Sequence, residues 1–166
     1  MNRMNIEEHL KAISQSAGNS QIHLAAVIVA YFTALKSSDL MNLKWENIDF
    51  DNAKLTVQMQ NSGRVACLPL HPVAIQHLQA LPKRSETDHV FDGVDFLSLS
   101  RRLKTPAGLV RGMHFLRWLA ASAVDRVSHG LGAALLCHVG QEVEFPQLRE
   151  AVSAMPFPAA WKGGAA

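Results

Sequence analysis

Apolar residues recur at helical spacing through most of the chain. The clearest run places five residues on one helical face: Leu24, Val27, Ile28, Tyr31 and Leu35. A helix with so wide an apolar face lies in the core, so the pattern predicts a buried helix at 24–35. It also makes Tyr31, the chain's only tyrosine, a residue that faces the core.

Shorter stretches with the same periodicity predict further helices. They are expected at 5–13, 72–81, 95–103, 114–121 and 146–154, with a polar loop at 14–20. A short helix also begins near Ser37, whose hydroxyl can cap it. Pro72 suits the first turn of the second of these helices, and Pro82 ends it, because proline is tolerated at a helix start but cannot continue a helix.

Alternating apolar and polar residues replace the helical pattern between 48 and 70. Three short strands are expected at 48–50, 54–60 and 64–70. Asp51 and Asn52 suit the first turn, and Gly63 supplies positive φ for the loop that joins the second and third strands. The sequence therefore predicts an α+β fold that is mostly helical, with a small three-stranded antiparallel sheet.

Composition is typical of a soluble globular protein. The 166 residues suit one domain, and the 48% apolar content is ordinary for such a protein. Because there is no secretory signal and no apolar run approaching the roughly 18 residues of a membrane span, we expect a cytoplasmic protein without a membrane segment. Sixteen basic residues against fourteen acidic ones give a net charge of +2, which neither indicates nor excludes a nucleic-acid partner.

The two cysteines, Cys67 and Cys137, are expected to be small core residues in a reduced compartment. Cys67 lies near His71 in the sequence, and Cys137 precedes His138 directly. No Cys-x-x-Cys spacing supports a zinc site from these four residues. We therefore expect neither a metal nor another cofactor.

The stretch 33–50 contains the most specific motif. Its matching residues are Thr33, Leu35, Ser38, Asp39, Leu40, Leu43, Trp45, Ile48 and Asp49. In this order they resemble the opening motif of the tyrosine recombinase (phage integrase) catalytic domain, and the resemblance extends over about 4–148. It implies the catalytic-domain fold of that family and a DNA partner. Lys36 stands where the family has its first catalytic arginine, so a point charge replaces a planar fork that donates two hydrogen bonds.

Two further stretches resemble later motifs of the same family. His114 and Arg117 match its His-x-Leu-Arg motif, and one helical turn separates them, so both side chains can address one phosphate from the same helix face. The stretch 135–138 resembles the motif Leu-Leu-Gly-His, with cysteine in place of glycine. The resemblance makes His138 a third phosphate contact.

The residues that would cut DNA are replaced or missing. Asn61 stands at the family's hairpin lysine and cannot donate a proton at neutral pH. The resemblance places the nucleophilic tyrosine after His138, but 144–149 contains none. Tyr31 faces the core, and neither Ser128 nor Ser153 has a motif that would supply a base. No catalytic set is intact, and its remnant positions are Lys36, Asn61, His114, Arg117 and His138.

The near-neutral total charge hides a basic stretch between Ser98 and Arg126, where six basic residues oppose Asp125 alone. A solvated helical face would show the same pattern. The resemblance favours contact with DNA phosphates instead. The expected DNA-binding residues are Lys36, Arg64, Arg101, Arg102, Lys104, His114, Arg117 and His138.

The chain is expected to form a single recombinase-like catalytic domain at 1–166, with no separate N-terminal core-binding domain. The C-terminal tail, 146–166, has two interpretations. It packs on its own domain, or it mediates self-association, since recombinase protomers commonly exchange their C-terminal segments. The sequence does not choose between them.

These observations predict a catalytically inactive, integrase-like protein that binds duplex DNA and acts as a regulator or accessory factor of a mobile genetic element. Two alternatives stay open. The chain could be a protein-interaction module that docks on an intact recombinase or on itself, with Phe157 and Trp161 as anchors. It could also be a recombinase completed by a tyrosine from another chain.

Overall fold

The computed structural model describes residues 5–58, 63–83, 85–108, 112–137 and 145–163. Its helices are α1 (Ile6–Ala17), α2 (Gln21–Thr33), α3 (Ser37–Met41), α4 (Pro72–Gln79), α5 (Phe96–Arg102), α6 (Gly112–Val127), α7 (Leu131–Cys137) and α8 (Phe145–Ser153). Two short 3₁₀ helices lie at Trp45–Asn47 and Ala159–Gly163. The strands are β1 (Ile48–Asp49), β2 (Lys54–Gln58) and β3 (Val65–Pro69).

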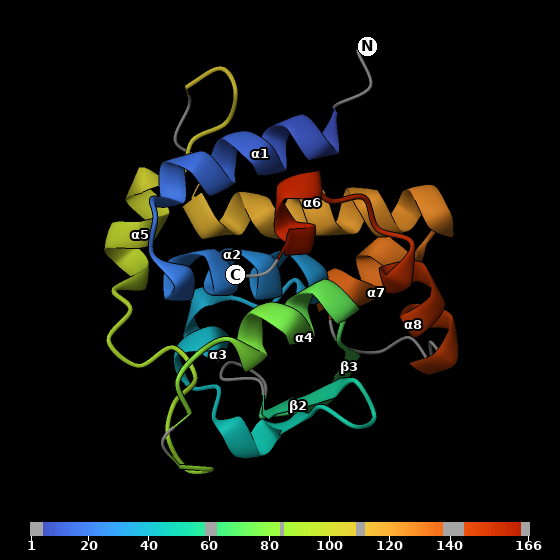
Figure 1. Cartoon of the computed structure of the whole chain (residues 1–166). Coiled ribbons are helices and arrows are strands. Elements are labelled where there is room, and N and C mark those ends of the chain that lie inside the picture. The colour runs from blue at the N-terminus through green and yellow to red at the C-terminus, as the bar shows by residue number, and fades with distance from the viewer. Residues whose placement is uncertain (1–4, 59–62, 84, 109–111, 138–144, 164–166) are drawn as a thin grey trace.

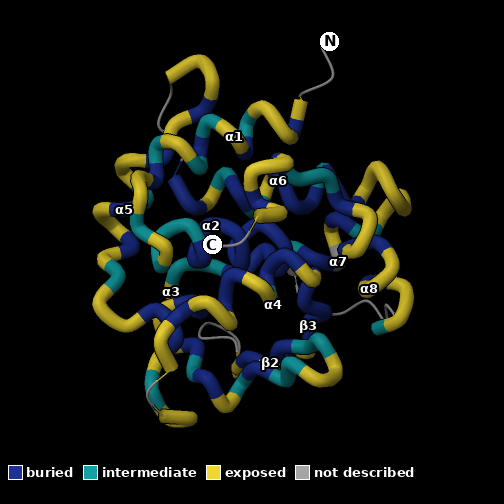
Figure 2. Tube along the Cα trace, in the orientation of Figure 1, coloured by how far each residue is buried: buried dark blue, intermediate teal, exposed yellow. Residues whose placement is uncertain are grey.

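Helix α2 lies at the centre of the molecule, between α6 on one side and α4 on the other (Figure 1). Every residue from Ala25 to Thr33 is buried, so this helix is the dark blue centre of Figure 2. A helix that is apolar on all sides must be covered on all sides. The predicted buried helix is therefore confirmed, and Tyr31 is one of its core residues.

The sheet has the strand order β1-β2-β3, and both neighbouring pairs are antiparallel. Leu55 pairs with Leu68 and Val57 with Ala66, and these four side chains are buried. The residues between them on β2 point to solvent, as alternation along a half-buried strand requires. The predicted mixture of helices with a small antiparallel sheet is confirmed, although β1 is only two residues long.

The predicted end of the first helix is wrong. Helix α1 does not stop at Ile13 but continues to Ala17, through residues predicted as a polar loop. The hydroxyls of Ser14 and Ser16 donate to carbonyl oxygens of the preceding turn, and Ala17 is buried, so polar composition alone misplaced the end of the helix. Gly18, with a φ of 91°, then ends it.

Cys67 is exposed rather than part of the core. Its two neighbours on β3, Ala66 and Leu68, point inward, so alternation places the thiol on the outer face. His71 is occupied elsewhere, because its Nδ1 accepts a hydrogen bond from the Val73 amide at the start of α4. Among the residues that the model describes, no three potential ligands form a metal site.

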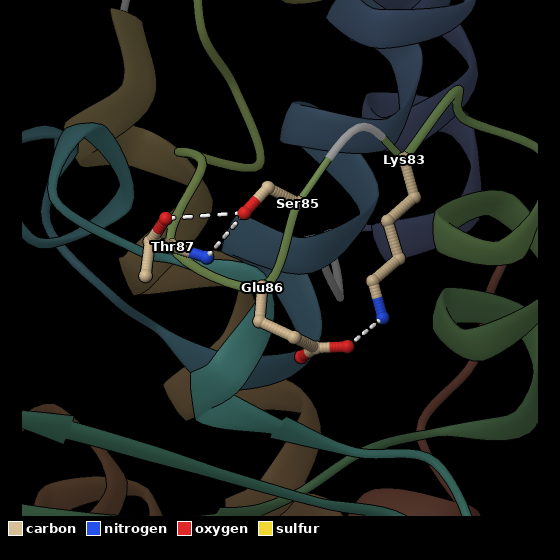
Figure 3. A network of polar contacts seen from close by, with 4 residues as sticks. All are labelled: Lys83, Ser85, Glu86 and Thr87. Carbon is tan, nitrogen blue, oxygen red and sulfur yellow. Dashed lines mark hydrogen bonds and ion pairs between the residues drawn. The ribbon is translucent and has the colours of Figure 1, made fainter.

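The segment between α4 and α5 pairs with the chain that follows α3. The Val90 amide donates to the Leu43 carbonyl at 2.9 Å, and the Glu46 amide donates to the Glu86 carbonyl at 2.9 Å. Figure 3 shows the exposed side of this segment, where Lys83 pairs with Glu86 and the Ser85 hydroxyl contacts that of Thr87. An exposed pair of this kind contributes about 1 kcal/mol at most.

The C-terminal segment packs on its own domain. The Trp161 side chain is 1% exposed, and its Nε1 donates to the Ser14 hydroxyl at 2.9 Å. The His77 Nε2 lies 2.9 Å from the Trp161 carbonyl oxygen, and the Tyr31 hydroxyl donates to the Pro156 carbonyl at 2.6 Å. In the described part of the tail, Trp161 and Pro156 thus contact their own domain, and self-association through the tail stays a prediction. No helix in the described ranges is long and apolar enough to span a membrane.

The burial of His71 predicts a loss of stability in mild acid. Its ring stacks on Phe32 at a centroid distance of 4.2 Å, and burial lowers the pKa of the imidazole below 6.5, partly offset by a hydrogen bond with the Ser153 backbone. The folded state therefore favours the neutral ring. The stability that the buried neutral ring gives the fold is complete above pH 6.5 and is lost as the pH falls below that value.

We expect the Tm of the wild type to fall more steeply between pH 7.5 and pH 5 than that of His71→Asn, since asparagine also caps a helix but does not titrate in this range. Thermal unfolding followed by circular dichroism at several pH values measures both slopes. Equal slopes would show that His71 contributes nothing to the acid sensitivity.

Candidate nucleic-acid interface

The side chain of Arg117 joins the three segments that resemble family motifs. It projects from the second turn of α6, and its Nε donates to the Ala34 carbonyl at 2.8 Å. Its Nη2 donates to the Leu136 carbonyl, also at 2.8 Å. Ala34 lies two residues before Lys36, and Leu136 lies two residues before His138. One guanidinium thus ties α6 to the end of α2 and to the last turn of α7.

The backbone at Ala34 has a conformation that few residues other than glycine adopt. Its φ of 56° and ψ of 22° are left-handed, and they turn the chain out of α2 toward α3. The turn leaves the Ala34 carbonyl outside the α2 ladder, where Arg117 satisfies it.

Lys36 directly precedes α3 and is half-buried. Its carbonyl accepts from the amides of Asp39 and Leu40, so Lys36 is the N-cap and Ser37 is the first helical residue rather than the cap. The ammonium group of Lys36 makes no hydrogen bond or ion pair with any residue in the described part of the chain. Lys36 thus lies two residues after Ala34, whose carbonyl Arg117 bonds, and its ammonium group has no partner among the described residues.

His114 lies on α6 one turn before Arg117 and is exposed. Its ring has no hydrogen-bond or ring partner among the residues that are described. Arg117 is half-buried and directs two of its donors at backbone carbonyls. The two residues therefore have different roles in the folded chain. His114 faces solvent, while Arg117 holds the segments around it in place.

The basic residues at the end of α5 lie near the start of α6. The Met113 amide donates to the Ser100 hydroxyl at 2.9 Å, and a Cβ at Gly112, whose φ is 68°, would lie 2.2 Å from that hydroxyl oxygen. This close approach brings the end of α5 to the turn of α6 that contains His114. The basic side chains there, all of them exposed, belong to Arg101, Arg102 and Lys104.

The remaining predicted contacts are not part of this junction. Arg102 directs one donor at His23, since its Nη2 lies 3.0 Å from the His23 Nδ1. Arg64 is exposed just before β3, in the sheet. Asn61 and His138 lie outside the described residues, so their predicted roles stay predictions.

Tyr31 cannot serve as a nucleophile in this fold. It is fully buried, its hydroxyl donates to the Pro156 carbonyl, and burial raises the pKa of the phenol far above its ordinary value. Ser153 donates its hydroxyl to the Glu150 carbonyl in the last turn of α8.

Arg149 ties α8 to the turn before β2. It lies over the Phe145 ring and donates to the Asn52 carbonyl.

Sequence reasoning missed two features of this region. The carbonyl partners of Arg117 were not predicted, because every residue has a carbonyl and the sequence does not mark which ones are left unsatisfied. The exposure of Trp118 on α6 was also not anticipated.

No protein-family model matches the chain, and no curated protein matches it. Among solved structures, it is similar to the integrase from mycobacterium phage Brujita, with a TM-score of 0.68 and 22% identity over 86% of this chain and 55% of that one. It is also similar to XerA recombinase, with a TM-score of 0.65 and 16% identity over 87% of this chain and 61% of that one.

The chain thus spans less than two thirds of the length of either of these proteins. The agreement in three dimensions establishes a tyrosine-recombinase-like fold, as the motif at 33–50 predicted. The mostly helical architecture with a three-stranded antiparallel sheet is the architecture of the integrase catalytic domain.

Proposed function

We propose that this protein binds duplex DNA through its phosphates without cutting it, as a regulator or accessory factor of a mobile genetic element. The observation that carries this proposal is the Arg117 junction. By bonding to Ala34 and Leu136, Arg117 fixes the three motif segments together. Lys36, two residues after Ala34, and His114, one helical turn before Arg117, have no protein partner in the described chain.

Side-chain donors without a protein partner suit a phosphate. The Lys36 ammonium donates as a point charge, and the His114 ring can donate a hydrogen bond. The exposed Arg101 and Lys104 add positive charge near the His114 end of α6, with no carboxylate bound to either within the described residues. Contacts of this type position a protein on DNA and carry little sequence information.

Three features support the proposal that the protein does not cut DNA. Lys36 lacks the fork that holds two phosphate oxygens at once, and Asn61 lacks a transferable proton. The sole tyrosine in the sequence is buried in α2, with its hydroxyl committed to Pro156. A covalent tyrosyl–DNA bond would therefore need a tyrosine that this sequence does not contain.

The interface is tested by comparing the binding of Lys36→Ala and His114→Ala with that of wild type on a mixed-sequence duplex at several salt concentrations. We expect Lys36→Ala to weaken binding about equally on all sequences and to reduce the slope of log K against log salt by about 1, because one phosphate contact is lost. His114→Ala should also bind more weakly than wild type on the same duplexes, since the ring that donates to a phosphate oxygen is lost.

Lys83→Ala is the matched control. Lys83 is also a lysine, but it lies on the segment between α4 and α5 and is already paired with Glu86 (Figure 3). Its removal should leave both affinity and salt slope close to wild type. Equal losses from Lys36→Ala and Lys83→Ala would assign binding to diffuse charge and would contradict an interface at the Arg117 junction.

A further inference from the structure

Trp118 is an exposed tryptophan on a helix whose other large apolar residues are mostly buried. Its side chain is 61% exposed, whereas Trp45 and Trp161 are 4% and 1% exposed. It has no hydrogen bond and no ring contact with any described residue. An indole left in water forgoes the favourable burial that the other two tryptophans obtain, so its position calls for an explanation.

The position of Trp118 on α6 links it to the proposed interface. It follows Arg117 directly and lies four residues after His114, so the indole and the imidazole are neighbours on one exposed helix face. The rotation of this face is fixed by the bonds from Arg117 to Ala34 and Leu136. Trp118 is therefore held beside the group that is expected to contact a phosphate.

Asp125 is the acidic residue on the same face of α6, and its charge is not expected to repel a DNA phosphate near His114. Asp125 lies two turns further along α6, and its Oδ1 accepts from the amides of Gly130 at 3.1 Å and Gly132 at 2.7 Å. Its charge is thus directed at the turn between α6 and α7. On α6 itself, the residues proposed to contact DNA therefore lie in the N-terminal half, which contains both His114 and Trp118.

We propose that Trp118 is a further DNA-contact residue, whose indole packs on the deoxyribose next to the phosphate that His114 contacts. This inference rests on the proposed function. An indole combines a large apolar face, which suits the carbon-rich surface of a sugar, with an N–H at its edge that can donate to a phosphate oxygen. The contact adds affinity without reading the base sequence.

Acrylamide quenching of tryptophan fluorescence tests the contact directly. Because Trp45 and Trp161 are buried, the quenchable emission comes mainly from Trp118. We expect a saturating amount of a mixed-sequence duplex to reduce the quenching of wild type markedly and to leave that of Trp118→Phe nearly unchanged. In gel shifts, Trp118→Ala should bind about fivefold more weakly or worse, the range of aromatic contacts to nucleic acid.

Val127→Ala is the control for loss of an exposed apolar residue, since Val127 is 42% exposed at the far end of the same helix. It should bind as wild type does. If DNA binds with the expected dependence on Lys36 while acrylamide still quenches Trp118 fully, this inference is overturned and the proposed function stands. If the wild type binds no duplex under any salt condition, both are overturned.

Discussion

Replacing Arg117 with alanine is expected to lower the free energy of unfolding by about 2–4 kcal/mol, a loss typical of removing hydrogen bonds from a charged donor to buried acceptors. The guanidinium donates to the carbonyls of Ala34 and Leu136, and Ala34 is fully buried. Alanine leaves both carbonyls without this partner at the junction of α2, α6 and α7. Urea unfolding followed by circular dichroism measures the difference.

Two variants on the same helix separate the hydrogen bonds from charge and from helix propensity. Arg117→Lys retains the positive charge but cannot donate in two directions from one planar group, so it should recover only a minor part of the loss. His114→Ala removes an exposed side chain and should stay within about 0.5 kcal/mol of wild type. Wild-type stability in Arg117→Ala would show that the three segments are held together without this residue.

Replacing Trp161 with alanine is expected to cost about 3–5 kcal/mol, the usual penalty for deleting a large buried aromatic side chain. Trp161 meets Tyr31 and Phe32 edge-on at centroid distances of 5.8 Å and 6.0 Å, and its Nε1 bonds to Ser14. The loss should free the segment after α8 from α1 and α2. Urea unfolding of the variant and of wild type provides the comparison.

Trp118→Ala is the matched control, because it removes the same side chain from an exposed position and should change stability by about 0.5 kcal/mol or less. Protein concentration tests where Trp161 packs. With the tail docked on its own domain, the Tm does not depend on concentration, whereas exchange of the tail between two chains would raise the Tm as concentration rises. Such a rise would contradict packing within the chain.

The fold could be predicted where local pattern and burial agree. The apolar run of α2 has helical spacing throughout, and the pairing of Leu55 with Leu68 follows from strand alternation on either side of Gly63. The prediction of a buried Cys67 is wrong because it followed residue type. Alternation along β3 puts Cys67 on the outer face, since Ala66 and Leu68 on either side face the core. The motif at 33–50 indicated the recombinase-like fold, which the solved structures bear out.

The candidate site was less accessible to sequence reasoning, because it depends on backbone groups. The pattern brought His114 and Arg117 together but could not show that Arg117 would donate to Ala34 and Leu136. Nor did it show that Ser14 would receive the Trp161 indole across the molecule. Such contacts join residues far apart in sequence through groups that leave no periodic signal.

The central claim is that this chain holds duplex DNA but does not cut it. A single binding reaction with a nicked suicide duplex, which traps any covalent intermediate, tests both halves when it is divided between a native gel and a denaturing gel. The account predicts a salt-sensitive shift on the native gel and only free DNA on the denaturing gel. A DNA-linked protein band that survives denaturation, or the absence of any native shift at low salt, would contradict it.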